Sequence, residues 1–109
     1  MASFDDVSRH REIGYLASDL ILCAEVANEK SDVLTLPYLD IQEELSDKAR
    51  GFDGSITKEF FDGMQASLAD FAGFAQKYGG DAEVAKRRRF NREYCARSMD
   101  EARKVIRKY

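Results

Sequence analysis

Apolar side chains, most of them large, recur every three or four positions between residues 60 and 78. They are Phe60, Met64, Leu68, Phe71, Ala75 and Tyr78. An α-helix advances about 100° per residue, so side chains at this spacing lie on one face. Charged residues such as Glu59, Asp62 and Asp70 fall away from that face. The pattern predicts a helix over 58–78 whose apolar stripe belongs to a hydrophobic core.

Helical periodicity extends over most of the chain, and no segment alternates convincingly as a β-strand does. We expect four helices, over residues 4–27, 37–50, 58–78 and 82–108. Pro37 falls in the first turn of the second helix, where a missing N–H costs nothing, and Asp81 is a suitable N-cap for the last. Short connections favour antiparallel neighbours. The sequence therefore predicts an all-α protein, an antiparallel bundle of four helices in a single domain over residues 1–109.

The chain has no segment typical of a membrane span. Its longest strongly apolar run, residues 15–27, is too short and is interrupted by Ser18, Asp19 and Glu25. The opening residues, MASFDDVSRHREIG, have no apolar stretch of the signal-peptide type. We expect neither membrane association nor a secretory signal.

Two cysteines, Cys23 and Cys95, stand far apart in the sequence and show no metal-ligand spacing. Isolated cysteines of this kind are most often buried, reduced thiols that pack as small apolar side chains. Taken with the expected absence of a membrane span, this interpretation predicts a cytoplasmic protein.

The first helix is apolar on two sides. One stripe consists of Ile13, Leu16, Ala17, Leu20, Ala24 and Ala27. Tyr15, Leu22 and Val26 form a second stripe, nearly opposite to the first. Because no helix is surrounded in a bundle of four, two interpretations stay open for the second stripe. Either it is a self-association surface, which predicts a possible homodimer, or a neighbouring helix or the segment 31–36 covers it.

Charge is unevenly divided along the chain. Residues 1–80 hold 7 Lys and Arg against 15 Asp and Glu, a net charge of −8, whereas residues 81–109 hold 10 against 5, a net charge of +5. The whole chain carries −3. Five of the ten bases of the last helix share an outer face with Glu93 and Asp100; these bases are Lys86, Arg89, Arg97, Lys104 and Arg107. We expect this face to be a solvated ionic surface.

The polarity of the last helix reverses over residues 87–94. Arg87, Arg88 and Asn91 fall on its apolar face, whereas Phe90 points toward solvent and Tyr94 lies at the boundary. A bare guanidinium is too costly to bury, so the two arginines either pair with internal carboxylates or bind an outside ligand. The internal candidates are Asp19, Glu25, Glu43 and Glu44. The predicted partner-binding residues are Arg87, Arg88, Phe90, Asn91, Arg92 and Tyr94.

These residue types suit two classes of ligand. Arg, Phe and Tyr are frequent in protein-binding hot spots, and they also pair with phosphates and stack on bases in single-stranded nucleic acid. The isoelectric point near 5.2 favours a protein partner. We therefore expect a non-catalytic protein that binds another protein as an adaptor, an inhibitor or immunity-type protein, or an assembly subunit. The alternative is a nucleic-acid-binding protein that uses the same basic helix.

Residues that carry catalysis or hold metals do not form a recognisable set. His10, the one histidine, stands among charged residues, and we expect it to be exposed. The segment FDGSITKEFF is similar to the second half of an EF-hand calcium loop, but the first two ligand positions fall on Ala49 and Gly51. We predict no enzyme activity, no catalytic residue, no metal and no cofactor.

Overall fold

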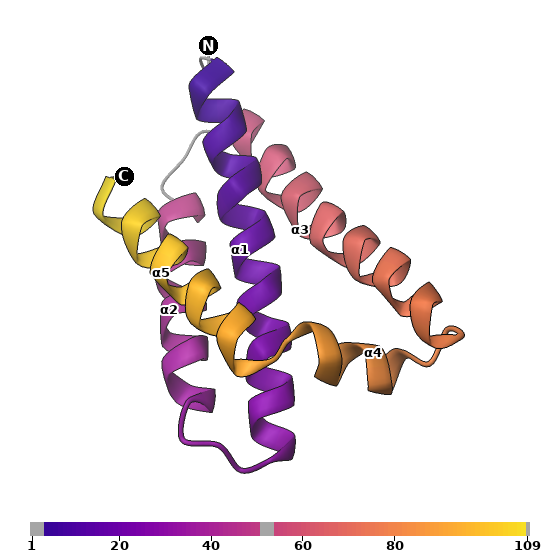
Figure 1. The fold of residues 1–109 in the computed structure, drawn as a ribbon. Helices are drawn as coiled ribbons and strands as arrows, with labels where there is room; N and C mark the ends of the chain where they lie inside the picture. The colour runs from indigo at the N-terminus through magenta and orange to yellow at the C-terminus, as the bar shows by residue number, and fades with distance from the viewer. Residues whose placement is uncertain (1–3, 51–53, 109) are drawn as a thin grey trace.

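A computed structural model describes residues 4–50 and 54–108 of this protein. These residues form five α-helices and one 3-10 turn, with no strand among them (Figure 1). The elements are α1 Phe4–Glu29, α2 Thr35–Arg50, α3 Gly54–Ala75, η1 Gln76–Tyr78, α4 Ala82–Arg89 and α5 Arg92–Lys108. The predicted all-α class is confirmed. In this part of the chain no helix is long and apolar enough to cross a membrane.

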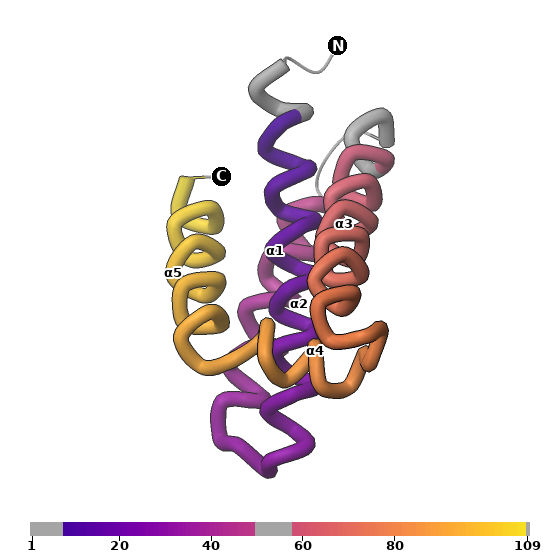
Figure 2. The backbone as a smooth tube through the Cα atoms, turned by 45° about the vertical axis from the view of Figure 1, so that its right-hand side comes forward, coloured from indigo at the N-terminus to yellow at the C-terminus, as the bar shows by residue number. Residues whose placement is uncertain are grey.

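Helix α1 occupies the centre of the fold. Helices α2, α3 and α5 all pack against it, while α3 and α5 lie on different sides of it (Figure 2). The short α4 crosses from the end of α3 to the start of α5. This central position explains why α1 is apolar on two sides, because a helix with neighbours on several sides buries more than one stripe.

The second stripe of α1 is largely covered. Val26 is buried, and Leu22 is half-buried against the core. Tyr15 is half-buried and donates a hydrogen bond of 2.5 Å to Asp70 of α3. Neighbouring parts of the fold therefore cover this stripe. Its residues do not present the exposed apolar face that a self-association surface requires.

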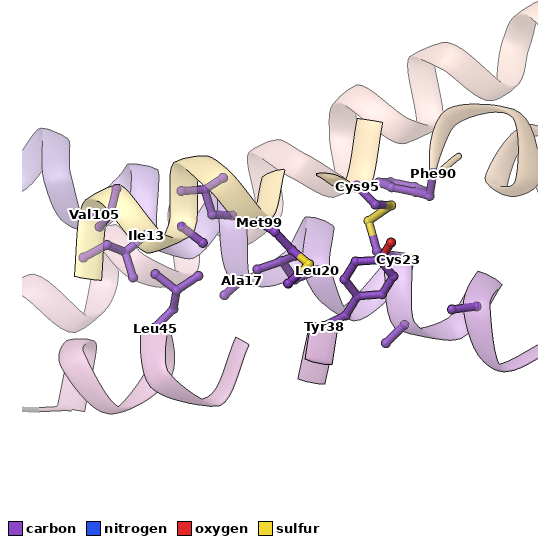
Figure 3. Packing of buried hydrophobic residues seen from close by; sticks show 14 of the residues in the cluster. Ile13, Ala17, Leu20, Cys23, Tyr38, Leu45, Phe90, Cys95, Met99 and Val105 are labelled. Carbon is purple, nitrogen blue, oxygen red and sulfur yellow. A yellow bond between two sulfur atoms is a disulfide. The ribbon is translucent and has the colours of Figure 1, made fainter. Parts of the chain in front are cut away.

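The main core lies between α1, α2 and α5 (Figure 3). It includes Ile13, Ala17, Leu20, Leu45, Met99 and Val105. His10 is also buried, contrary to the expected exposure, because it precedes Ile13 and Ala17 by three and seven residues and so shares their inward face.

Helices α1 and α3 meet through two glycines. A Cβ atom on Gly14 would lie 1.9 Å from the carbonyl oxygen of Phe60, and one on Gly63 would lie 2.0 Å from the carbonyl oxygen of Arg11. The two backbones are therefore in direct contact, and no residue other than glycine fits at either position without displacing a helix. An Arg11–Glu59 ion pair of 2.6 Å flanks this crossing.

The apolar stripe predicted for α3 is only partly buried. Phe60 and Ala75 are buried, but Leu68 and Tyr78 are 45% and 38% exposed. Helix α3 packs closely against α1 at Gly63, and this contact leaves Leu68 and Tyr78 uncovered. Residues 51–53, which include part of the segment similar to a calcium loop, lie outside the described ranges.

Candidate interaction site at the α4–α5 junction

The single helix predicted over 82–108 is divided in two. Asp81 caps α4 as expected, accepting a hydrogen bond of 3.2 Å from the Val84 N–H. The helix stops at Phe90, whose backbone leaves the helical region with φ −94° and ψ 55°. Asn91 then caps the start of α5, because its side-chain oxygen accepts a hydrogen bond of 2.9 Å from the Tyr94 N–H. An asparagine that caps a helix explains a break that the apolar spacing did not reveal.

This break changes the direction of Phe90. The side chain is 2% exposed, with its ring 5.8 Å from that of Phe71 and 5.5 Å from that of Tyr94. The expectation that Phe90 faces solvent is wrong, because it assumed an unbroken helix, and the junction turns the ring into the core. Phe90 is therefore part of the packing beneath the surface and not a contact residue.

Cys23 of α1 and Cys95 of α5 form a disulfide beside Phe90 (Figure 3). The interpretation of both residues as reduced thiols is wrong. Their separation of 72 residues carried no signal of pairing, because only the return of α5 along α1 brings the two sulfurs together. The bond fixes the start of α5 to the central helix. Disulfides of this kind persist in oxidising environments and are rare in the cytosol.

Asp19 is a buried carboxylate one helical turn before Cys23. It is 2% exposed and accepts hydrogen bonds of 2.6 Å from the Ser67 hydroxyl and 2.5 Å from the Tyr94 hydroxyl. Burial raises the pKa of the Asp19 carboxyl above its usual range, against the opposing effect of the two hydrogen bonds. Burial and the bond to Asp19 likewise raise the pKa of the Tyr94 hydroxyl.

Arg89 lies inside the junction rather than on the expected outer face. Its guanidinium carbon sits 5.6, 5.8 and 5.4 Å from the ring centres of Phe74, Phe90 and Tyr94. It also donates a hydrogen bond of 3.3 Å to the Tyr15 hydroxyl. Burial, followed by the hydrogen bond to Asp70, raises the pKa of Tyr15 to about 12. Three aromatic faces and nearby carboxylates thus stabilise this cation internally.

Two further bases of the region pair with acids of the same molecule. Arg92 donates hydrogen bonds of 3.1 and 3.2 Å to the two carboxylate oxygens of Asp32, although its side chain stays 72% exposed. Lys86 lies 3.5 Å from carboxylate oxygens of both Glu25 and Glu29 on α1. Glu25 is thus an internal partner of a base, as one interpretation of the sequence expected, but the base is Lys86.

Arg87 and Arg88 differ from these neighbours. Both are exposed, and neither forms an ion pair or side-chain hydrogen bond with any residue in the described ranges. Of the six predicted site residues, four lie at the surface of the junction: Arg87, Arg88, Asn91 and Arg92. Tyr94 is half-buried behind them, and Phe90 is covered. The candidate site is therefore a basic surface formed by the end of α4 and the start of α5.

A cavity under this surface holds no ligand-sized space. It is lined by the disulfide, Phe90, Tyr38 and the Asp32–Arg92 pair, and its volume is about 30 Å³. That volume is about the volume that one water molecule occupies in liquid water. Small-molecule sites usually span about 300–1,000 Å³. This cavity is therefore too small for a small-molecule ligand.

Comparison with known proteins gives no further information about this site. No protein-family model, curated protein or solved structure matches the chain.

Proposed function

We propose that this protein binds an acidic surface of a protein partner through Arg87, Arg88 and Arg92, and that it acts by binding without catalysis. The observation that carries this proposal is the pair of exposed, internally unpaired guanidinium groups of Arg87 and Arg88. Guanidinium groups are well suited to carboxylates because they form two parallel hydrogen bonds with them. A binder of this kind serves as an adaptor, an inhibitor or immunity-type protein, or an assembly subunit.

The junction holds these arginines on a fixed support. Ala85 is fully buried on the inner side of α4, Arg89 lies among three aromatic rings, and the disulfide anchors the start of α5. A surface that is ordered before binding loses less conformational entropy when a partner arrives. Preorganisation therefore favours a specific protein contact at this place.

A protein partner is favoured over nucleic acid. Binding of single strands depends on aromatic faces that stack on bases, and here Phe90 is buried while Tyr94 is half-buried and bonded to Asp19. The exposed arginines provide positive charge, but no exposed aromatic ring of this site is available for a base to stack on.

The disulfide also bears on the compartment. The cytoplasmic prediction depended on reduced cysteines, and the Cys23–Cys95 bond removes that basis. We propose that the protein works where disulfides persist, in an oxidising compartment.

Fluorescence anisotropy tests the binding proposal with two labelled probes: an acidic peptide that also contains leucines, and a single-stranded oligonucleotide. The wild type should bind the peptide more tightly than the oligonucleotide, and Arg87→Glu/Arg88→Glu should weaken peptide binding at least tenfold. Arg107→Glu/Lys108→Glu is the matched control, since it makes the same change in net charge at exposed positions near the end of α5. Tighter binding of the oligonucleotide, or equal losses in both variants, would contradict the proposal.

A further inference from the structure

The outer face of α2 combines exposed leucines with acids. Leu36 and Leu39 are 68% and 39% exposed, and Val33 beside them is 83% exposed. Asp40, Glu43 and Glu44 follow on the same outward side of the helix, opposite the buried Tyr38 and Leu45. These three acids are exposed, and none forms an ion pair with another residue of the described ranges. An apolar patch with an acidic margin is typical of a contact surface.

This face has the chemistry that the basic surface of α4 lacks. Arg87 and Arg88 on α4 require carboxylates, and α2 offers unpaired carboxylates beside apolar area. Among the described residues, Arg87 and Arg88 form no ion pair with these acids, and α2 and α4 lie on opposite sides of α1 (Figure 1). Opposite charges that are separated within one chain can pair between two copies of it.

We infer that a second copy of this chain is the partner: the leucine and acidic face of its α2 docks on the basic surface of α4. This inference depends on the proposed function and identifies its acidic partner surface. The charges steer and orient the two copies, and the burial of Leu36 and Leu39 adds to the affinity, so the contact depends on both. Because the two faces lie on opposite sides of the molecule, the contact is head-to-tail and builds a ring or an open chain of copies.

Sedimentation velocity over a range of protein concentrations tests this assembly directly. The mean mass of the wild type should rise with concentration at about 50 mM salt and fall toward that of the monomer at about 500 mM, where the screening length is roughly 4 Å. A wild type that stays monomeric at all concentrations at the lower salt would overturn the inference.

Two blocked variants separate the head-to-tail contact from other forms of association. Arg87→Glu/Arg88→Glu blocks the α4 surface, and Leu36→Asp blocks the α2 face. Each variant alone should be monomeric, whereas an equimolar mixture should form a pair that does not grow, because one intact α2 face meets one intact α4 surface. Leu68→Asp is the matched control, since Leu68 is an exposed leucine on α3, and it should assemble as the wild type does. A mixture that stays monomeric overturns the inference.

The outcome also distinguishes this inference from the proposed function. If the wild type stays monomeric but binds the acidic peptide through Arg87 and Arg88, only the identity of the partner is wrong. If Arg87→Glu/Arg88→Glu changes neither self-association nor peptide binding, the basic surface is not a binding site and both proposals fail.

Discussion

The Tyr94 hydroxyl donates a hydrogen bond of 2.5 Å to the buried carboxylate of Asp19. Each residue lies close to a cysteine of the disulfide. Tyr94 is the residue directly before Cys95, and Asp19 lies one helical turn before Cys23. Helices α1 and α5 are therefore joined by a covalent bond and a charged hydrogen bond on neighbouring turns. Together these two links hold the α4–α5 junction, and the arginines that it carries, in a fixed position.

Removing the Tyr94 hydroxyl should destabilise the protein. Tyr94→Phe leaves Asp19 with the Ser67 hydroxyl as its one remaining hydrogen-bond donor from a side chain of the described ranges. A hydrogen bond to a charged group contributes about 1.5–3 kcal/mol, so we expect a loss of that order in the free energy of unfolding by urea. Tyr78→Phe, at an exposed position, should change it by less than about 0.5 kcal/mol. Equal effects of the two substitutions would show that the bond to Asp19 contributes nothing.

Loss of the disulfide should lower the melting temperature. The bond closes a loop between positions 72 residues apart, and the chain-entropy model assigns such a loop about 4 kcal/mol. Thermal unfolding followed by circular dichroism, with and without reductant, measures the effect. Cys23→Ala/Cys95→Ala should melt below the oxidised wild type and show no response to reductant. A wild type whose melting temperature is insensitive to reductant would contradict this prediction.

The glycine crossing should be intolerant of a single methyl group. In Gly63→Ala the new Cβ would lie 2.0 Å from the Arg11 carbonyl oxygen, so α1 and α3 must separate, and we expect a loss of about 1–3 kcal/mol or more in the free energy of unfolding. Gly73→Ala is the matched control on the same helix, where nothing lies within 4 Å of the added atom. It should stabilise the protein by about 0.5–1 kcal/mol, since alanine is the better helix former. Chemical denaturation compares the two, and effects of the same sign would contradict the crossing geometry.

The buried Asp19 should make stability depend on pH. Its pKa is higher in the folded than in the unfolded chain, so its contribution is fully present below the unfolded pKa of about 3.9 and is lost as the pH rises through the folded pKa. Asp32 acts oppositely: its lowered pKa gives a contribution that is lost on acidification. We therefore compare the wild type with Asp19→Asn, which isolates the first group. Urea unfolding from about pH 4 to 7 should show wild-type stability falling relative to this variant, and parallel curves would exclude the effect.

Features that depend on neighbouring residues were predictable from the sequence. The all-α class, Pro37 in the first turn of α2 and the Asp81 cap of α4 all follow from local patterns, and the structure confirms them. Helical periodicity and capping each depend on residues a few positions apart, so the amino-acid sequence is sufficient to predict them.

The candidate site was only partly predictable. The charge run marked Arg87, Arg88 and Arg92 as candidate contact residues. The helical projection was wrong, however, in placing Arg87 and Arg88 on the apolar face, since both are exposed. Their exposure and the burial of Phe90 both depend on the helix break that Asn91 caps. The apolar periodicity predicts a helix that continues across this position. It does not reveal the break, because the break depends on one side-chain hydrogen bond, from the Tyr94 N–H to Asn91, that has no repeating pattern. The arginines of the predicted surface are therefore exposed, whereas Phe90 is buried beneath them.

Pairings between distant parts of the chain were decided by the tertiary structure alone. The Cys23–Cys95 bond and the contact of Gly63 with α1 join segments about 50 to 70 residues apart, and the same return of the chain sets the Tyr94–Asp19 hydrogen bond. A sequence shows which side chains are available for such contacts, but a contact forms only when packing brings both partners to one place. Here the sequence by itself determined the all-α class and the charges, and the packing of α3, α4 and α5 around α1 determined which residues remain at the surface.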